Sequence, residues 1–228
     1  MKTNVYLIRT LTNMHPGSGD SGYGVVDKLV QRDPATGYPV IHMSGIKGAL
    51  RQFFEEKLGK TAPLVKTIFG STPQENAEDV SQGELRFLSA DVLAMPAPNN
   101  ESDDNDSSPF HLYCHPIIVA SWLDKVKIFA GKFVNLDDTG WVQDGAIFHQ
   151  VAMDLPVIAR NYLDNGESKN LWYEEVVPRE TRFGCIIQGP ESILNAFHTE
   201  ISGKVIQLGG NATVGYGYCL FDLQNLKA

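Results

Sequence analysis

The sequence predicts an α+β fold: a sheet built from two split βαβ units, with helices on one of its faces. Apolar residues follow a strand period in some segments and a helix period in others, and these segments run β-α-β, insertion, β-α-β along the chain. That order is typical of a ferredoxin-like sheet. Neither a repeat nor a linker divides the 228 residues, so we expect a single domain over 1–228 with large insertions.

The first unit is N-terminal. Residues 4–12 are rich in β-branched and apolar side chains and end at a Gly/Pro/Ser cluster, which predicts a strand. Residues 44–58 place apolar side chains on one helical face, with Ser44 as the expected N-cap and Gly59 as the stop. Residues 83–96 alternate and then become apolar, which predicts the second strand.

The second unit is C-terminal. Ahead of it, residues 116–129 predict a short helix that runs into a strand. Residues 181–189 predict a strand, 190–202 a helix with apolar side chains at helical spacing, and 215–223 the closing strand. RNA-binding RRM domains share this topology, but a topology alone assigns no function.

The composition is that of a soluble globular protein, with 43% hydrophobic and 20% charged residues. No apolar run is long enough to span a membrane, and the first residues lack the pattern of a secretory leader. Cys114, Cys185 and Cys219 are widely spaced and form no CxxC pair, which predicts reduced thiols. We therefore expect a cytoplasmic protein with no membrane partner.

The charge is unevenly distributed. A net charge of −8 argues against a nucleic-acid partner if the chain is taken as a whole. Residues 27–66, however, hold seven basic and four acidic side chains, whereas 74–108 hold one basic and nine acidic ones. The acidic, polar run at 97–109 predicts a disordered loop. Because the excess of acid lies in one segment, an RNA partner remains compatible with the composition.

Lys47 occupies an unfavourable position for a cation. With Ser44 as N-cap it is the third helical residue, where it opposes the helix dipole by about 0.3–1 kcal/mol. A phosphate bound at this helix end, with Arg51 one turn later, would explain both cations. The alternative is a lysine that extends into water at little cost, and the spacing alone favours this alternative.

Two glycine-rich segments also have two interpretations each. Residues 17–24 match GxGxxG, but no helical pattern follows, so we exclude a dinucleotide site and retain a plain turn or a surface for RNA backbone. Residues 208–217, LGGNATVGYG, are either a loop that lets backbone approach a ligand or a loose hairpin.

Three further patterns concern acidic and histidine side chains. Asp27 follows two valines, and His15 lies across a turn-rich loop, so the two are either an acid–base pair or a turn-capping Asp with a solvated His. HLYCH at 111–115 is weak support for a metal site. We interpret the pair Glu174-Glu175 as an ordinary strand edge.

Taken together, these motifs resemble a known family. GYGVVDKLVQRDPATGYPVIHMSGIKGALR (22–51) is similar to the N-terminal signature of the RAMP superfamily of CRISPR proteins, and LGGNATVGYGYC (208–219) to its C-terminal glycine-rich loop. The segments between them resemble the branch that forms the backbone of type III-B (Cmr) effector complexes. The resemblance implies a RAMP fold in which residues around 150–175 form a thumb-like β-hairpin.

The resemblance also implies a function. Such subunits stack head to tail with copies of themselves and with other subunits along a CRISPR guide RNA, and each cleaves the paired target RNA for antiviral defence. Cleavage would need Asp27, with His15 beside it, and a divalent cation such as Mg²⁺, and would resemble attack of a 2′-OH on the next phosphate. The implied RNA-binding residues are Ser44, Gly45, Lys47, Gly48, Arg51, Gly209, Gly210, Asn211, Gly215 and Gly217.

The sequence departs from the family pattern at two places. Lys28-Leu29 replaces the commoner apolar-Pro pair after the aspartate, and Tyr216 stands where a basic residue is frequent. The second departure puts a phosphate contact at Tyr216 in doubt. Two alternative functions stay open: a structural backbone subunit that does not cut, and a guide-processing endoribonuclease that acts alone.

Overall fold

The computed structural model describes residues 1–21, 26–71, 81–99 and 108–227. Its helices are α1 (Met43–Leu58), α2 (Pro63–Phe69), α3 (Pro116–Ala130), α4 (Gly145–Met153), α5 (Glu191–Ile201) and the 3₁₀ turn η2 (Ala212–Val214). Its strands are β1 (Lys2–Thr10), β2 (Gly17–Ser21), β3 (Lys28–Val30), β4 (Val40–Ile41), β5 (Arg86–Phe87), β6 (Ala90–Pro98), β7 (Phe110–Cys114), β8 (Phe133–Asn135), β9 (Trp141–Gln143), β10 (Val157–Asp164), β11 (Glu167–Glu175), β12 (Arg182–Gly189), β13 (Ile206–Gln207) and β14 (Tyr218–Lys227).

The main sheet contains the two βαβ units expected from the sequence. Its strand order is β13-β14-β1-β12-β6-β7-β9, and β1 pairs antiparallel with both β12 and β14. One βαβ unit consists of β1, α1 and β6, and the other of β12, α5 and β14. Their strands alternate in the sheet in the order β14-β1-β12-β6. This order agrees with a ferredoxin-like arrangement, and the α+β class is confirmed.

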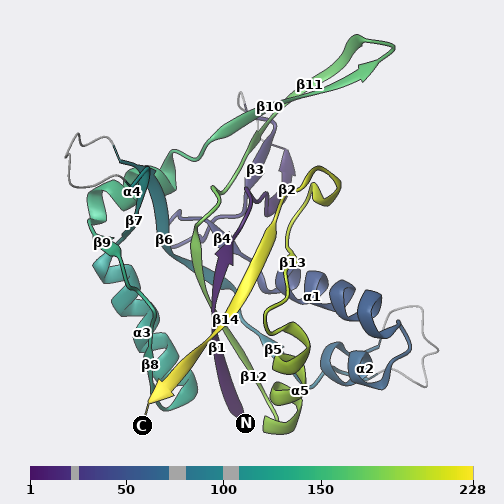
Figure 1. The fold of residues 1–228 in the computed structure, drawn as a ribbon, viewed down its shortest axis with the longest axis vertical. Helices are drawn as coiled ribbons and strands as arrows, with labels where there is room; N and C mark the ends of the chain where they lie inside the picture. The colour runs from purple at the N-terminus through teal and green to yellow at the C-terminus, as the bar shows by residue number, and fades with distance from the viewer. Residues whose placement is uncertain (22–25, 72–80, 100–107, 228) are drawn as a thin grey trace.

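Helices cover both faces of the main sheet, not one as expected. Tyr6 and Ile8 of β1 join the larger core cluster beneath α1 and α5, whereas Val5 and Leu7 join a second cluster. Figure 1 shows α3 on the side of the sheet away from α1 and α5. Trp122 of α3 lies against the sheet over Gly184 of β12, where a side-chain Cβ would collide with the indole. Because side chains alternate between the two faces of a strand, β1 has buried side chains on both of its faces.

Two elements differ locally from the sequence prediction. Helix α1 begins at Met43 after the extended residue His42, and Ser44 lies inside its first turn and does not cap it. The start is fixed because the amide of His42 donates to Gln31 Oε1 over 2.8 Å, directly after β4 joins the sheet.

The predicted helix-to-strand change within 116–129 is wrong: α3 continues to Ala130. His115 Nδ1 accepts from the amide of Ile117 and caps it, and Gly131 ends it in the left-handed region. Trp122 and Val126, one turn apart, are both buried against the sheet, and this packing overrides the β-propensity of the segment.

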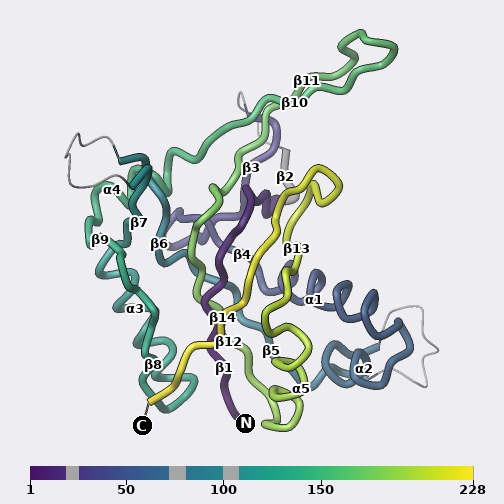
Figure 2. Tube along the Cα trace, in the orientation of Figure 1, coloured from purple at the N-terminus to yellow at the C-terminus, as the bar shows by residue number. Residues whose placement is uncertain are grey.

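A second, four-stranded sheet has the order β10-β11-β3-β2. Strands β10 and β11 form an antiparallel hairpin, which projects well beyond the main sheet (Figures 1 and 2). Strand β3 lies parallel to β11 at its base, with Lys28 opposite Glu174. The pairing of β3 with β11 therefore places the N-terminal strands β2 and β3 at the base of the hairpin. No helix within the described ranges is long and apolar enough to cross a membrane.

The acidic segment falls mainly outside the described residues. Ala97 and Pro98 end β6, and Asn99 donates through its backbone N–H to Pro109 O over 3.1 Å. The disorder expected over 97–109 concerns 100–107, which the structure does not describe.

Candidate active site

Asp27 is held at the edge of β11 by backbone groups. Its N–H donates to Tyr173 O over 3.0 Å, and its Oδ2 accepts from Tyr173 N over 2.8 Å. The other carboxylate oxygen, Oδ1, has no hydrogen-bond donor among the residues that the structure describes. The residue is exposed. Asp27 is therefore an exposed carboxylate held by backbone hydrogen bonds, not a buried acid.

His15 is bound two residues farther along the same strand. Its Nδ1 lies 2.7 Å from Glu175 O, and because a carbonyl oxygen can only accept, Nδ1 carries the proton. The lone pair of the neutral ring is thus on Nε2. That nitrogen faces Gly17, where an added Cβ would lie 3.2 Å from it. His15 itself is buried, so the solvated histidine considered from sequence is not what the fold provides.

The strand geometry brings these two groups together. Residues two apart in a strand direct their backbone N–H and C=O to the same edge, about 7 Å apart. Tyr173 and Glu175 of β11 stand in this relation and hold Asp27 and His15, respectively. The two residues considered as an acid–base pair therefore bind the same edge of one strand.

Glu174, between those two positions, is fully buried and binds four side chains. Its Oε1 lies 2.8 Å from Lys28 Nζ and 2.7 Å from Trp172 Nε1. Its Oε2 lies 2.8 Å from Arg160 Nε and 2.9 Å from Asn211 Nδ2. The carboxylate thus joins β3, both strands of the hairpin and the glycine-rich loop 208–217. It fixes the base of the hairpin beside Asp27.

The environment of Glu174 keeps it ionised. Burial alone would raise its pKa, but the hydrogen bonds from Lys28 and Trp172 and the charges of Lys28 and Arg160 outweigh burial and lower the pKa to about 2. Glu175 is also engaged: Oε1 lies 3.0 Å from Arg32 Nη2, and Oε2 accepts from Val30 N. The interpretation of this pair as an ordinary strand edge is wrong.

The sequence contained a signal for this cluster. Consecutive residues of a strand face opposite sides, so at a packed strand base one of two adjacent glutamates must be buried. A buried carboxylate requires paired cations or donors. Lys28, however, lies far from Glu174 in the sequence, and only the pairing of β3 with β11 identifies it. Arg160 comes from the neighbouring strand β10, and the register of the hairpin places it beside Glu174.

The N-terminus of α1 lies close to this site. Gln31 follows β3 and binds the amide of His42 at the helix start, and four extended residues from Asp27 span at most about 14 Å. No acidic side chain occupies the first turn, and no side chain caps it. The free N–H groups of this turn are suited to bind an anion.

The implied RNA-binding residues on α1 differ in how free they are. Ser44, Gly45 and Gly48 are exposed, and nothing lies within 4 Å of a Cβ built on either glycine. Lys47 is the fifth helical residue, because the helix begins at Met43, so the dipole penalty inferred at the third position is smaller than expected. Arg51 is paired with Glu55 over 2.7 Å within the helix.

The glycine-rich loop 208–217 packs against His15. The N–H of Gly210 donates to His15 O over 3.0 Å, and a Cβ on Gly209 would lie 2.6 Å from that oxygen. Gly209, Asn211, Gly215 and Gly217 have positive φ. A positive φ or close packing thus explains why these positions have glycine or asparagine without any ligand. Gly210 has neither a positive φ nor a close neighbour at its Cβ position. Arg160 lies over Tyr216, 4.5 Å from the ring centroid, so an arginine stands beside the position where a basic residue was missing.

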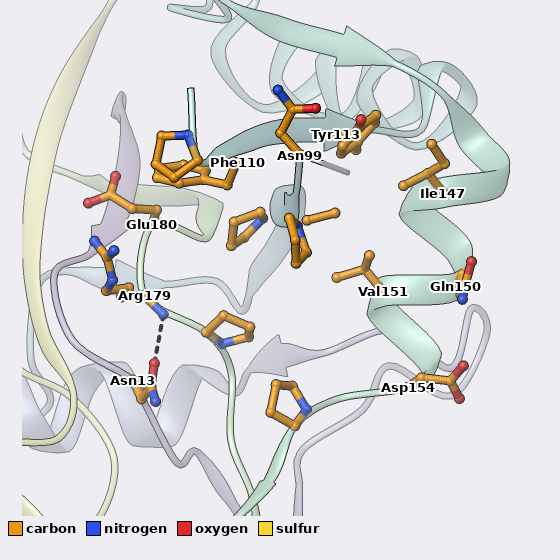
Figure 3. A pocket seen from close by; sticks show the side chains of 16 residues that line it. Asn13, Asn99, Phe110, Tyr113, Ile147, Gln150, Val151, Asp154, Arg179 and Glu180 are labelled. Carbon is orange, nitrogen blue, oxygen red and sulfur yellow. Dashed lines mark hydrogen bonds between the residues drawn. The ribbon is translucent and has the colours of Figure 1, made fainter. Parts of the chain in front are cut away.

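A separate concavity of about 770 Å³ lies between β7, α4 and the residues after β11. Figure 3 shows Phe110, Tyr113, Ile147 and Val151 on its walls and the hydrogen bond from Arg179 N to Asn13 Oδ1 at its rim. The described residues that line it include neither Asp27 nor a histidine. The concavity is therefore separate from the residues held at the edge of β11.

The described residues contain no group of three or more His, Cys, Asp or Glu placed to hold a metal ion. His115, from the HLYCH motif, caps α3 instead. Of the three carboxylates described at this end of β11, Asp27 keeps an oxygen without a hydrogen-bond donor, since both oxygens of Glu174 and Glu175 are engaged. Mg²⁺ requires only one or two protein carboxylates when phosphates and waters complete its shell, so Asp27 fits such an ion bound jointly with RNA.

Comparison with known proteins places the chain in a family. The model of the RAMP superfamily matches residues 7–220. The chain belongs to the RAMP superfamily. As a superfamily member it is similar to the CRISPR system Cmr endoribonuclease Cmr4 of Pyrococcus furiosus, with 25% identity over 99% of this chain and 97% of that one. The CRISPR system CMR subunit Cmr4 of Saccharolobus solfataricus is 34% identical over 58% of this chain and 42% of its own length.

Solved structures of this RAMP branch have the same fold. A chain of the type III-B Cmr-beta complex bound to cognate target RNA superimposes with a TM-score of 0.79 at 19% identity, covering 98% of this chain and 97% of the other. The oligomeric Cmr4 of Pyrococcus furiosus gives a TM-score of 0.69 at 18% identity over the full length of both chains. The RAMP fold expected from the motifs is confirmed.

Proposed function

We propose that this protein is a backbone subunit of a type III-B CRISPR effector that holds guide RNA and cleaves the paired target RNA. The observation that carries the proposal is the exposed carboxylate of Asp27, fixed beside His15 on one edge of β11. It stands in a chain whose full-length relative bears the name Cmr endoribonuclease. A structural backbone has no need of such a pair.

The chemistry assigned to this pair is transesterification within the target RNA. The 2′-oxygen of one nucleotide attacks the adjacent phosphorus, so an O2′–P bond forms while the P–O5′ bond breaks. Asp27 positions the 2′-hydroxyl, and Nε2 of His15 accepts its proton; the departing 5′-oxygen takes a proton from water. The products are a 2′,3′-cyclic phosphate and a 5′-hydroxyl. General acid–base groups contribute about 10²–10⁴-fold in such steps.

A divalent cation such as Mg²⁺ fits this assignment through the free oxygen of Asp27. When bound, it would supply positive charge to the phosphate oxygens. The protein contributes the fixed position of the carboxylate, which two backbone hydrogen bonds to Tyr173 determine.

The guide strand belongs at the N-terminus of α1. The free N–H groups of the first turn, the bare surface at Gly45 and Gly48, and the charge of Lys47 together suit a phosphate. Glycine inside a helix is less favourable than alanine by about 0.5–1 kcal/mol. Because no neighbour excludes a side chain at Gly45 or Gly48, close approach of RNA backbone accounts for these residues. Gly210, Asn211 and Arg51 are secondary contacts.

The hairpin β10–β11 is the candidate thumb. It projects from the sheet (Figure 1), and its exposed apolar side chains include Tyr162, Leu163 and Leu171. Apolar side chains can insert between base steps, and the tyrosine ring can stack on a base, so the hairpin could interrupt a guide–target duplex. Because Glu174 fixes the base of the hairpin next to Asp27, each interruption would place the neighbouring target phosphate at the cleavage site. Copies of the chain along one guide would then cut at regular intervals, in the cytoplasm where target transcripts are found.

A cleavage assay with the guide-loaded assembly tests the function and separates its alternatives. The proposal expects labelled complementary RNA to be cut at regular intervals into products ending in a cyclic phosphate, and non-complementary RNA to stay intact. Binding of target without any cut would favour the structural backbone. Release of free, processed guide from a precursor by the chain alone would favour the guide-processing enzyme. The same assay with magnesium or a chelator measures the requirement for a divalent cation.

A further inference from the structure

We propose that Lys28 is a further catalytic residue, whose ammonium binds the scissile phosphate of the target RNA beside Asp27. This inference rests on the proposed function, because it needs an RNA phosphate at the edge of β11. It goes beyond that function by naming Lys28 as the side chain whose positive charge stabilises the negative charge on the scissile phosphate during cleavage.

The position of Lys28 is fixed relative to Asp27 by the same strand. Asp27 pairs with Tyr173 through the backbone, and Lys28 Nζ lies 2.8 Å from the carboxylate of the next residue, Glu174. The ammonium also lies 5.0 Å from the ring centroid of Trp172, a favourable cation–π arrangement. Two successive residues of β11, Tyr173 and Glu174, therefore hold the successive residues Asp27 and Lys28.

Charge in this cluster is not balanced. Glu174 supplies one negative charge, whereas Lys28 and Arg160 supply two positive charges, which leaves a net charge of +1. Both oxygens of Glu174 are already doubly engaged, by Lys28 and Trp172 on one and Arg160 and Asn211 on the other. Lys28 and Arg160 together thus supply more positive charge than Glu174 alone neutralises. Asp27, the residue before Lys28, adds a negative charge, but its carboxylate is bound to the backbone of Tyr173 and forms no ion pair with Lys28 in the described part of the chain.

Of the two cations, only Lys28 can reach a ligand. The side chain of Arg160 is 18% exposed and covered by Tyr216, whereas that of Lys28 is 50% exposed. Within the described part of the chain, Lys28 uses one of its three N–H donors, on Glu174. The remaining donors are available to non-bridging phosphate oxygens.

A cation at this place has a defined role in the step. When the 2′-oxygen adds to phosphorus, negative charge increases on the non-bridging oxygens before the P–O5′ bond breaks. A fixed ammonium stabilises that charge more than the charge of the ground state, so it raises the rate at saturation rather than the affinity. Lys28 gains or loses no proton, so the overall balance of the reaction is unchanged.

The test compares single-turnover cleavage and target affinity in guide-loaded assemblies. We expect Lys28→Ala to lower the rate at saturating target by about 10²-fold with target affinity nearly unchanged, and Lys28→Arg to retain most of the rate. Lys125→Ala is the matched control, because Lys125 also pairs with a carboxylate, that of Asp91 over 2.6 Å, and lies on α3, outside the proposed RNA-binding elements. It should cut as the wild type does.

A double variant separates catalysis from structural support. Lys28→Met with Glu174→Gln leaves the cluster at its original charge of +1 but without an ammonium at position 28. The proposal expects it to remain as slow as Lys28→Met alone. Recovery of cleavage in the double variant would overturn the proposal, since Lys28 would then serve only to neutralise Glu174.

The remaining outcomes distinguish this inference from the proposed function. Cleavage by Lys28→Ala at the wild-type rate, with Asp27→Asn inactive, would overturn the inference alone. A wild-type assembly that cuts no complementary RNA would overturn both.

Discussion

The carboxylate of Asp27 is held by backbone groups alone, and this explains an aspartate directly after two valines. Tyr173 donates its N–H to Oδ2 of Asp27, and its carbonyl oxygen accepts the N–H of Asp27. The carboxylate oxygen thus takes the place that a carbonyl oxygen of a neighbouring strand would have at the edge of β11. An asparagine there can accept the same hydrogen bond through its amide oxygen. The charge of Asp27 can therefore be removed without disturbing its position.

Glu174 gives the fold a pH dependence with a defined direction. Its pKa falls from 4.5 in the unfolded chain to about 2 in the folded one. Its stabilising contribution is therefore complete above pH 4.5 and is lost as the pH falls towards 2, a loss of about 3 kcal/mol. We expect Glu174→Gln to be less stable than wild type at pH 7, with the difference shrinking on acidification. Chemical denaturation at a series of pH values measures it.

Glu167→Gln provides the control for this prediction. Glu167 pairs with Lys169 on the exposed hairpin tip, where an ion pair contributes little to stability. Its denaturation curves should follow those of wild type at each pH. A constant difference between Glu174→Gln and wild type from pH 7 to pH 3 would contradict the assignment of a low pKa to Glu174.

Lys47 and Arg51 should contribute unequally to guide binding. Lys47 makes no ion pair with any described residue, whereas Arg51 is bound to Glu55. We expect Lys47→Ala to reduce the slope of log affinity against log salt by about one, and Arg51→Ala to reduce it less. Lys57→Ala, at the far end of α1 and paired with Glu200, is the control. Fluorescence anisotropy with labelled guide over a salt series gives these slopes. Equal slopes for Lys47→Ala and wild type would show that Lys47 extends into solvent and contacts no phosphate.

At the level of single residues, the catalytic assignment of Asp27 and His15 stays a prediction. The structure shows that both bind backbone groups of β11, which the sequence did not indicate. The role of Glu174 was not found, because its cations come from strands far apart in sequence. Ser44 was predicted as the N-cap because serine favours that position, but it lies in the first turn of the helix. The hydrogen bond from His42 N to Gln31 Oε1 determines where the helix begins.

Among the elements, helical and strand periods located the secondary structure well, and packing decided the exceptions. Strand β12 and helix α5 lie within one residue of their predicted bounds. Helix α3 was mistaken at its C-terminal half because Val126 and Ile128 favour strands locally. In the fold, Trp122 and Val126 bury one helical face on the main sheet, which no local pattern indicates.

The segment between β6 and β7 should be dispensable for RNA binding. Residues 100–107 carry four acidic and no basic side chains, and the hydrogen bond from Asn99 N to Pro109 O holds the ends of the strands together without them. Replacing 100–107 by a short Gly-Ser linker should leave guide affinity unchanged or higher, because only repulsive charge is removed.

A variant of the same length in which these four acids become their amides separates charge from length. It should bind guide RNA as the shortened chain does. Weaker binding by either variant in a direct titration would show that this segment contributes to the RNA interface.

For the whole molecule, the order of segments predicted the topology, since each hydrophobic period identifies one element and the split βαβ rule then restricts the strand order. The faces of the sheet were not predictable, because β1 buries both sides and the helix that covers the second side, α3, was read in part as a strand. In the smaller sheet, the hairpin β10–β11 agrees with the thumb-like hairpin expected around 150–175. The addition of β3 and β2 to that hairpin was missed, because β3 and β11 lie far apart in the sequence.

The projecting hairpin predicts assembly on RNA. Tyr162, Leu163 and Leu171 are each more than half exposed, and clustered exposed apolar side chains usually mark an interaction surface. We expect the purified chain to sediment as a 25.1 kDa monomer or as undefined small oligomers, and to form regular multiples when guide RNA is added. Analytical ultracentrifugation with guide RNA and with DNA of the same sequence tests this. A sharp monomer unaffected by RNA would count against a backbone role.

The most direct test of the central claim is cleavage by the Asp27→Asn variant in a guide-loaded assembly given labelled complementary RNA. The account predicts unchanged folding, guide assembly and target binding, with a cleavage rate lower by about 10²–10⁴-fold. Asp33→Asn is the matched control, because Asp33 lies in the same region and its carboxylate only closes a turn with Ala35 and Thr36; it should cut normally. Cleavage by Asp27→Asn at the wild-type rate would contradict the catalytic assignment and leave a structural backbone subunit.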